Sequence, residues 1–164
     1  MLPDFVLLRH RATSVWIDAK FNNPAVKQLV WDPDRFFSDE RCVVVKDQKK
    51  IKVARVAVEV SGVPYRIFIK RYNAFSWRAR LLSIFTRSGA FRSLQGAAIL
   101  QNAGFATAKP IAALESRRCG MVTKSFYLSK EIAGGKPADT YWREDLTTAK
   151  SHRFRHRRRF ISGL

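Results

Sequence analysis

Alternating apolar and polar residues in the first half of the chain predict β-strands. The stretch VARVAVEV at 53–60 places an apolar side chain at every second position, and YRIFIKRY at 65–72 has a strand-like composition. SGVP at 61–64 supplies the glycine and proline of a tight turn between them, and RCVVVKD at 41–47 precedes them as a short β-rich run. Because no helix separates these stretches, we expect three successive strands in an antiparallel meander.

The pattern then changes to helical spacing. WRARLLSIFTR at 77–87 is apolar with interspersed arginines and predicts a helix, and Ser88 fits the N-cap of a second one. Gly104 fits the C′ position that ends the second helix. Its apolar stripe, which we expect to pack on the sheet, consists of Phe91, Leu94, Ala97 and Ala98.

Two more strands are predicted at 110–116 and 125–132, followed by a flexible break, AGGKP, at 133–137. The element order is therefore β-β-β-α-β-β and then a hinge. Residues 1–40 are interpreted as an irregular N-terminal extension with short pieces of structure, because NNP and DPD interrupt any long element. Beyond the hinge we expect a weak helix near 138–149 and then the arginine-dense SHRFRHRRRF.

The net charge of the chain indicates which kinds of molecule it binds. The chain has 31 Lys and Arg against 13 Asp and Glu, a net charge of +18, which favours polyanions such as nucleotides, nucleic acids or phosphorylated lipids. Cys42 and Cys119 lie far apart without C-x-x-C spacing, so neither a zinc site nor a disulfide framework is indicated. We expect a reduced, cytoplasmic protein, since no stretch has the length of a membrane span and no signal peptide is recognisable.

Lys70 is the most informative residue of the predicted sheet. It lies near the end of the third strand, on the side that Phe68 and Tyr72 share. A lysine there either holds a phosphate, or covers apolar surface with its stem while its ammonium reaches water.

Three stretches of the sequence, one of which contains Lys70, resemble a known protein family. YRIFIKRYN, RSGAFRSLQGAAILQNAGFATAKPIAALESRR and SFYLSKEIAGG are similar, in order and spacing, to the Kdo/WaaP lipopolysaccharide kinases, a protein-kinase-like family related to the RIO kinases. The resemblance covers roughly residues 41–150. It implies an α+β fold: a kinase-like N-lobe at 41–133 with a five-stranded antiparallel sheet and one or two helices, then a hinge and the start of a helical C-lobe at 134–164.

The resemblance also implies a site. Lys70 matches the lysine that holds the α/β-phosphates of ATP and is the one catalytic residue assigned, while Glu131, Ile132 and Ala133 match the hinge whose backbone meets adenine. Gly104, Thr107 and Pro110 match the loop after the helix. ATP and Mg²⁺ are the cofactors implied for the full-length form, and no metal ligand is assigned.

Several kinase features are missing from the sequence. The connection KDQKKIK contains no glycine, so Lys49, Lys50 or Lys52 would have to contact phosphate through side chains, or else form a solvated basic turn. The helix position of the glutamate that pairs with the lysine falls at or near Ser93, and that helix contains no acid. After Lys70 the only aspartates are Asp139 and Asp145, and neither lies in a catalytic H-x-D motif.

Two functions follow as hypotheses. The first is the N-terminal part of an ATP-dependent kinase that phosphorylates a sugar hydroxyl of lipopolysaccharide core or a related glycolipid, with a peripheral contact to the anionic inner membrane; this chain alone is then expected to be inactive. The second is a small basic protein that binds nucleic acid without catalysis, with Phe154 and Phe160 stacking on bases beside the arginines of 153–159.

Overall fold

The computed structural model describes residues 4–38, 42–60, 62–73 and 76–134. The chain divides into two compact units, Met1–Glu131 and Ile132–Leu164. Only residues 132–134 of the second unit are described, so the helix expected near 138–149 and the arginine-dense segment lie outside the described residues.

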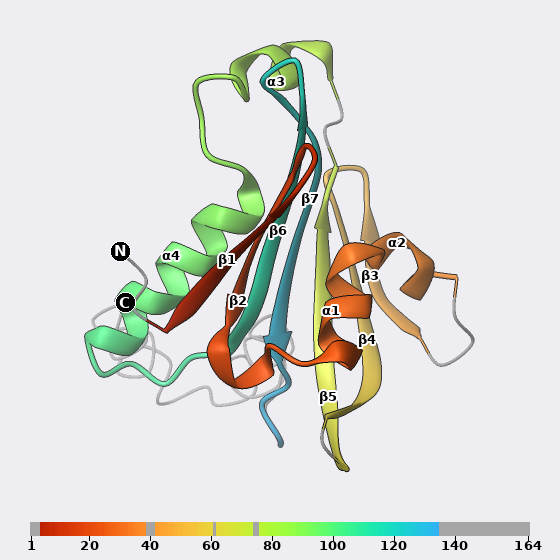
Figure 1. The fold of residues 1–164 in the computed structure, drawn as a ribbon, viewed down its shortest axis with the longest axis vertical. Coiled ribbons are helices and arrows are strands. Elements are labelled where there is room, and N and C mark those ends of the chain that lie inside the picture. The colour runs from red at the N-terminus through yellow and green to blue at the C-terminus, as the bar shows by residue number, and fades with distance from the viewer. Residues whose placement is uncertain (1–3, 39–41, 61, 74–75, 135–164) are drawn as a thin grey trace, which may run out of the picture. The chain divides into compact units, whose positions relative to one another are not determined.

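The first unit is built on one antiparallel sheet of seven strands in the order β1-β2-β6-β7-β5-β4-β3 (Figure 1). The strands are β1 Phe5–His10, β2 Thr13–Asp18, β3 Val43–Gln48, β4 Ile51–Val60, β5 Val63–Tyr72, β6 Pro110–Arg118 and β7 Met121–Lys130. The helices are the 3₁₀ turn η1 Ala19–Phe21, α1 Pro24–Trp31, α2 Pro33–Phe36, α3 Trp77–Leu82 and α4 Gly89–Asn102. The α+β class is therefore confirmed.

The predicted number of five strands is wrong, because the segment 1–40 contributes β1 and β2 to the same sheet. Val15 and Ile17 of β2 are fully buried, and β2 pairs with β6 at the edge that would otherwise be open. The turn between β1 and β2 consists of Arg11, with a φ of 50°, and Ala12. A two-residue turn of this kind is normally marked by Asn or Gly, and the sequence gives no such signal here.

The larger core lies on the sheet face that α1 covers. Alternate residues of β4, β5, β6 and β7 point to this face and pack with Val26, Leu29 and Val30 of α1. The alternation in VARVAVEV places Ala54, Val56, Val58 and Val60 on one face; Val58 is half-buried and the other three are buried. Asn23 begins α1 as its N-cap, since its side-chain oxygen accepts a hydrogen bond from the Val26 N–H.

Helix α4 packs on the opposite face, against β5, β6 and β7 (Figure 1). The predicted ends are confirmed: the Phe91 N–H donates to Ser88 Oγ over 3.2 Å, and Gly104 has the positive φ of a C′ residue, 79°. Three of the four predicted stripe residues are buried, and Ala98 is half-buried. The helix predicted at 77–87 is shorter than expected, since α3 ends at Leu82 and the chain continues in turns.

None of the helices within the described ranges is both long and apolar enough to cross a membrane.

Candidate functional site

Lys70 lies in the middle of the sheet, on the face that carries α4. Its neighbours in register are Val53 on β4 and Tyr127 on β7. Residues opposite each other in an antiparallel pair project on the same side, so these three side chains stand in one row across the sheet. Phe68 and Tyr72 lie two residues before and after Lys70 on the same side, as the sequence predicted. We call these five residues the Lys70 surface; all are half-buried.

The ammonium of Lys70 lies near an aromatic ring. Lys70 Nζ lies 5.1 Å from the centroid of the Tyr72 ring, within the range of a cation–π contact. The Tyr72 hydroxyl in turn hydrogen-bonds to Ser93 Oγ on α4. Ser93 is at or near the position where a kinase has its glutamate, so this helix is connected to Lys70 through Tyr72 instead of through a carboxylate.

Gly89, the first residue of α4, allows Tyr72 to lie where it does. A Cβ atom at Gly89 would come within 2.6 Å of Tyr72 Cδ1 and 2.8 Å of Cγ. Those are ring atoms close to the backbone, and they cannot turn aside as the end of a flexible side chain can. The absence of a side chain at Gly89 therefore sets the approach of α4 to β5. The sequence shows this glycine but gives no sign of its contact.

Tyr127 is the one described residue of this surface with a clearly shifted acidity. Burial, and to a lesser extent the neighbouring Tyr72, raise the pKa of Tyr127 from 10.0 to about 12. Its ring packs with Ala90, Leu94 and Ala113, the small core between α4 and the sheet. The phenol next to Lys70 is therefore neutral at physiological pH and adds no negative charge to the Lys70 surface.

Glu131 follows β7 directly and is bound at both its backbone and its side chain. Its N–H donates to the carbonyl oxygen of Arg66 over 2.9 Å, which continues the pairing of β5 with β7. Its carboxylate pairs with Arg55 at 3.4 Å and with Arg66 at 3.3 Å. Glu131 thus joins the end of β7 to both β4 and β5.

Ile132 and Ala133, the other predicted hinge residues, belong to the second unit. Ile132 is 54% exposed and Ala133 is exposed. Their predicted contact with adenine remains a prediction.

Lys49, Lys50 and Lys52, the three lysines that follow Asp47, make different contacts. Lys52 pairs with Asp47 at 3.0 Å and lies 5.7 Å from the ring of Phe37, which packs against the α1 core, so it points away from Lys70. Lys49 and Lys50 form the turn between β3 and β4, and their carbonyl oxygens accept hydrogen bonds from Asn73. This turn is therefore tied by its backbone to the end of β5.

Among the described residues, no group of three or more His, Cys, Asp and Glu side chains is placed to hold a metal ion. Comparison of the chain with protein-family models, curated proteins and solved structures gives no match. A function therefore has to be inferred from the Lys70 surface and its connections.

Proposed function

We propose that this chain is the N-terminal part of an ATP-dependent phosphotransferase, with the sheet and α4 as its N-lobe and Lys70 as the residue that holds the α/β-phosphates. In the full-length form the acceptor is a sugar hydroxyl of lipopolysaccharide core or a related glycolipid. The observation that carries the proposal is the place of Lys70: on an interior strand, on the side of α4, with its ammonium near the Tyr72 ring and the hydroxyl of that ring bound to Ser93 of α4.

The order of the strands supports this role. β5 carries Lys70 and lies between β4 and β7, and β7 leads directly to Glu131. Arg66, which binds the N–H of Glu131, is four residues before Lys70, about 13 Å along an extended strand. An extended nucleoside triphosphate can span that separation, with its base at Glu131 and its phosphates at Lys70.

The surface between these ends has suitable chemistry. Val53 and Phe68 are half-buried and apolar, so they offer a base or ribose a partly dehydrated contact. An ammonium can form a charge-assisted hydrogen bond with a phosphate oxygen, and a partly dry setting strengthens that bond.

Glu131 would meet adenine through its carbonyl oxygen, because its N–H is already bound to Arg66. The two arginine contacts of its carboxylate hold this residue in place. Because the described residues offer no group of three or more His, Cys, Asp and Glu side chains placed to hold a metal ion, we assign no step of the reaction to Mg²⁺.

The test is a titration of the isotope-labelled chain with Mg²⁺–ATP, followed by NMR. We expect weak binding, with the largest shifts in the backbone amides of Val53, Phe68 and Lys70. Lys70→Met should weaken binding by about tenfold, since one charge-assisted contact is lost. Lys130→Met is the matched control: Lys130 also lies on a strand, 5.0 Å from the ring of Tyr65, but on the other face of the sheet.

Equal effects of the two substitutions, or shifts spread over all exposed lysines, would contradict the proposal. Tight RNA binding that weakens steeply with salt, without a response to nucleotide, would favour the basic nucleic-acid-binding alternative.

A further inference from the structure

The segment from α3 to the start of α4 has an unusual distribution of apolar side chains. Helix α3 has no buried residue, although four of its six residues, in the sequence WRARLL, are apolar. The exposed fractions are 67% for Trp77, 46% for Leu81, 64% for Leu82, 42% for Ile84 and 87% for Phe85. We call these five residues the α3 surface. They lie within nine consecutive positions and so form a concentrated apolar patch rather than scattered exposed residues.

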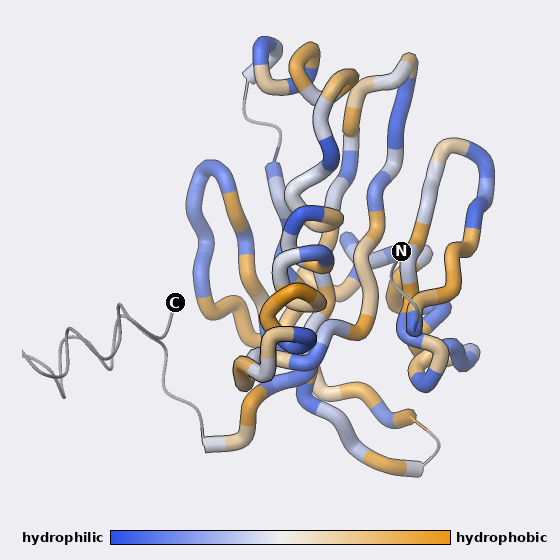
Figure 2. Tube along the Cα trace, turned by 90° about the vertical axis from the view of Figure 1, so that its left-hand side faces the viewer, coloured by the Kyte–Doolittle hydropathy of each residue, from blue (hydrophilic) through white to orange (hydrophobic). Residues whose placement is uncertain are grey.

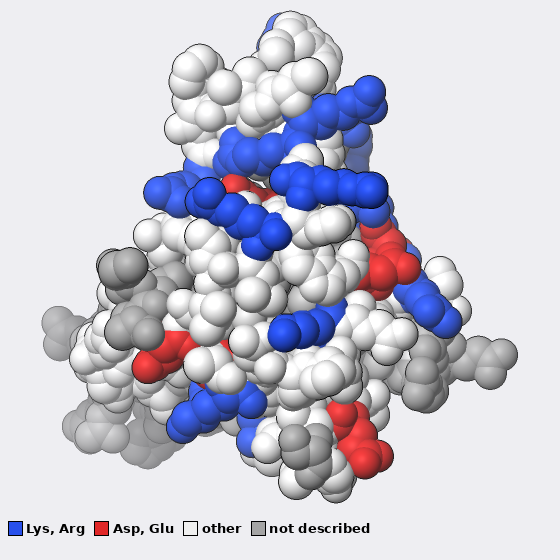
Figure 3. All heavy atoms as spheres, viewed as in Figure 1, with Lys and Arg blue, Asp and Glu red and all other residues white. Residues whose placement is uncertain are grey.

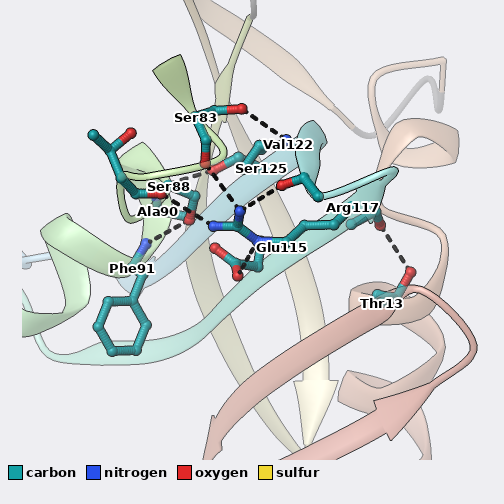
Figure 4. Close-up of polar contacts among 12 residues, drawn as sticks. Thr13, Ser83, Ser88, Ala90, Phe91, Glu115, Arg117, Val122 and Ser125 are labelled. Carbon is teal, nitrogen blue, oxygen red and sulfur yellow. Dashed lines mark hydrogen bonds and ion pairs between the residues drawn. The ribbon is translucent and has the colours of Figure 1, made fainter. Parts of the chain in front are cut away.

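The backbone beneath the α3 surface is firmly held (Figure 4). The guanidinium of Arg117, on β6, donates to the carbonyl oxygens of Ser83, Thr86 and Gly120 over 2.9, 3.1 and 2.8 Å, and to Glu115 over 3.0 Å. Ser83 Oγ also accepts a hydrogen bond from the Val122 N–H over 2.8 Å. The polar groups of this segment thus bind the β6–β7 hairpin, while its large apolar side chains are exposed to solvent.

Positive charge surrounds the α3 surface. Arg78 and Arg80 lie within α3, both exposed, and Arg87 follows it. Beside α3 is a cavity of about 230 Å³ whose cationic lining residues are Arg71, Arg80 and Lys124, with Asp34 as its one acid. On the face seen in Figure 1, Lys and Arg side chains gather near the end of the unit where α3 lies (Figure 3).

We infer that the α3 surface docks on an anionic lipid bilayer, with Trp77, Leu82 and Phe85 entering the interface and the arginines meeting lipid phosphates. Aromatic and leucine side chains next to arginines are the composition of segments that lie in a membrane interface. This docking does not depend on nucleotide binding and would hold for either function of the chain.

The position of the segment favours a bilayer over a second protein. Helix α3 lies at one extremity of the sheet (Figure 1), and hydrophobic and hydrophilic positions both occur at that end of the molecule (Figure 2). A projecting end can enter a bilayer without a complementary groove. Arginines between the apolar residues are attracted by an anionic lipid surface, and each adds to the affinity at low salt.

The test is sedimentation of the whole chain with vesicles of phosphatidylcholine, with and without phosphatidylglycerol, at low and high salt. We expect binding to the anionic vesicles that weakens with salt. The double substitution Leu82→Ser and Phe85→Ser should lower the partition coefficient by about tenfold or more, because two large apolar side chains no longer enter the lipid. Since both residues are exposed, circular dichroism should show an unchanged fold.

Ile99→Ser is the matched control, because Ile99 is 67% exposed on α4 but lies outside the α3 surface. It should bind vesicles as the unchanged chain does. Equal binding by the double variant and the unchanged chain would overturn the inference, as the charge alone would then account for it. Self-association of the chain that the double substitution abolishes, without binding to vesicles, would likewise overturn it and show a second copy as the occupant.

Discussion

Lys70 is positioned by aromatic residues. Its ammonium lies against the Tyr72 ring, the Tyr72 hydroxyl binds Ser93, and Tyr127 stands beside it in register. In the kinase pattern a glutamate of the helix forms an ion pair with the lysine, whereas here a neutral ring contacts the ammonium. This arrangement suggests how a helix without acidic residues can still position Lys70.

The raised pKa of Tyr127 makes stability depend on alkaline pH. The pKa is 10.0 in an unfolded chain and about 12 in the folded one, so the folded state keeps a proton that the unfolded state loses. The stabilising contribution of Tyr127 is therefore complete below pH 10 and is lost as pH rises from about 10 to about 12. We expect the free energy of unfolding to fall over this range, as measured with denaturant at each pH.

Tyr127→Phe should show a smaller decline over the same range, because phenylalanine has no proton to lose. The difference between the two pH profiles isolates the contribution of Tyr127 from that of every other group. Parallel profiles would mean that the phenol is not buried as described.

At the scale of elements, helix α4 contains two glycines, and we expect replacement by alanine to change the stability of the protein in opposite directions at the two positions. A Cβ at Gly89 would collide with the Tyr72 ring, whereas a Cβ at Gly96 would meet nothing within 4 Å. Gly96 lies in the helix interior, where alanine is favoured over glycine, whereas Gly89 is the first helical residue and its contact with Tyr72 decides the outcome there.

We predict that Gly96→Ala stabilises the protein by roughly 0.5–1 kcal/mol, the usual gain from alanine in a helix. Gly89→Ala should destabilise it by about 1–3 kcal/mol, since the ring or the helix must shift. Denaturant unfolding of both variants checks this. Stabilisation by Gly89→Ala would show that α4 does not approach β5 as closely as described.

The elements differ in how well the sequence predicted them. β3, β4, β5, β6, β7 and α4 follow from alternation, turn glycines and a serine N-cap, which are local signals. The pair β1 and β2 was missed, because Arg11 occupies a positive-φ turn position without the usual Asn or Gly. The contacts of Tyr72 with Gly89 and Ser93, and those of Arg117 with the α3 segment, join residues far apart in the chain, and no local pattern encodes them.

At the scale of the whole molecule, the net charge of +18 complicates every binding experiment. A chain this basic attracts nucleotides, nucleic acids and anionic lipids alike, and part of that attraction is independent of any specific site. A measured affinity for ATP would therefore not show whether the nucleotide binds at Lys70. A decisive measurement has to report which residue lies at the phosphates.

The most direct measurement uses an acyl-phosphate derivative of ATP. A lysine amine near the phosphates attacks the acyl carbon, keeps the acyl group as an amide and releases ATP, and mass spectrometry then identifies the acylated lysine. We predict that Lys70 is acylated in preference to more exposed lysines such as Lys130, and that excess ATP suppresses this labelling. Acylation that merely follows exposure across the lysines, and that ATP does not compete, would contradict the role of Lys70 as the phosphate-binding residue.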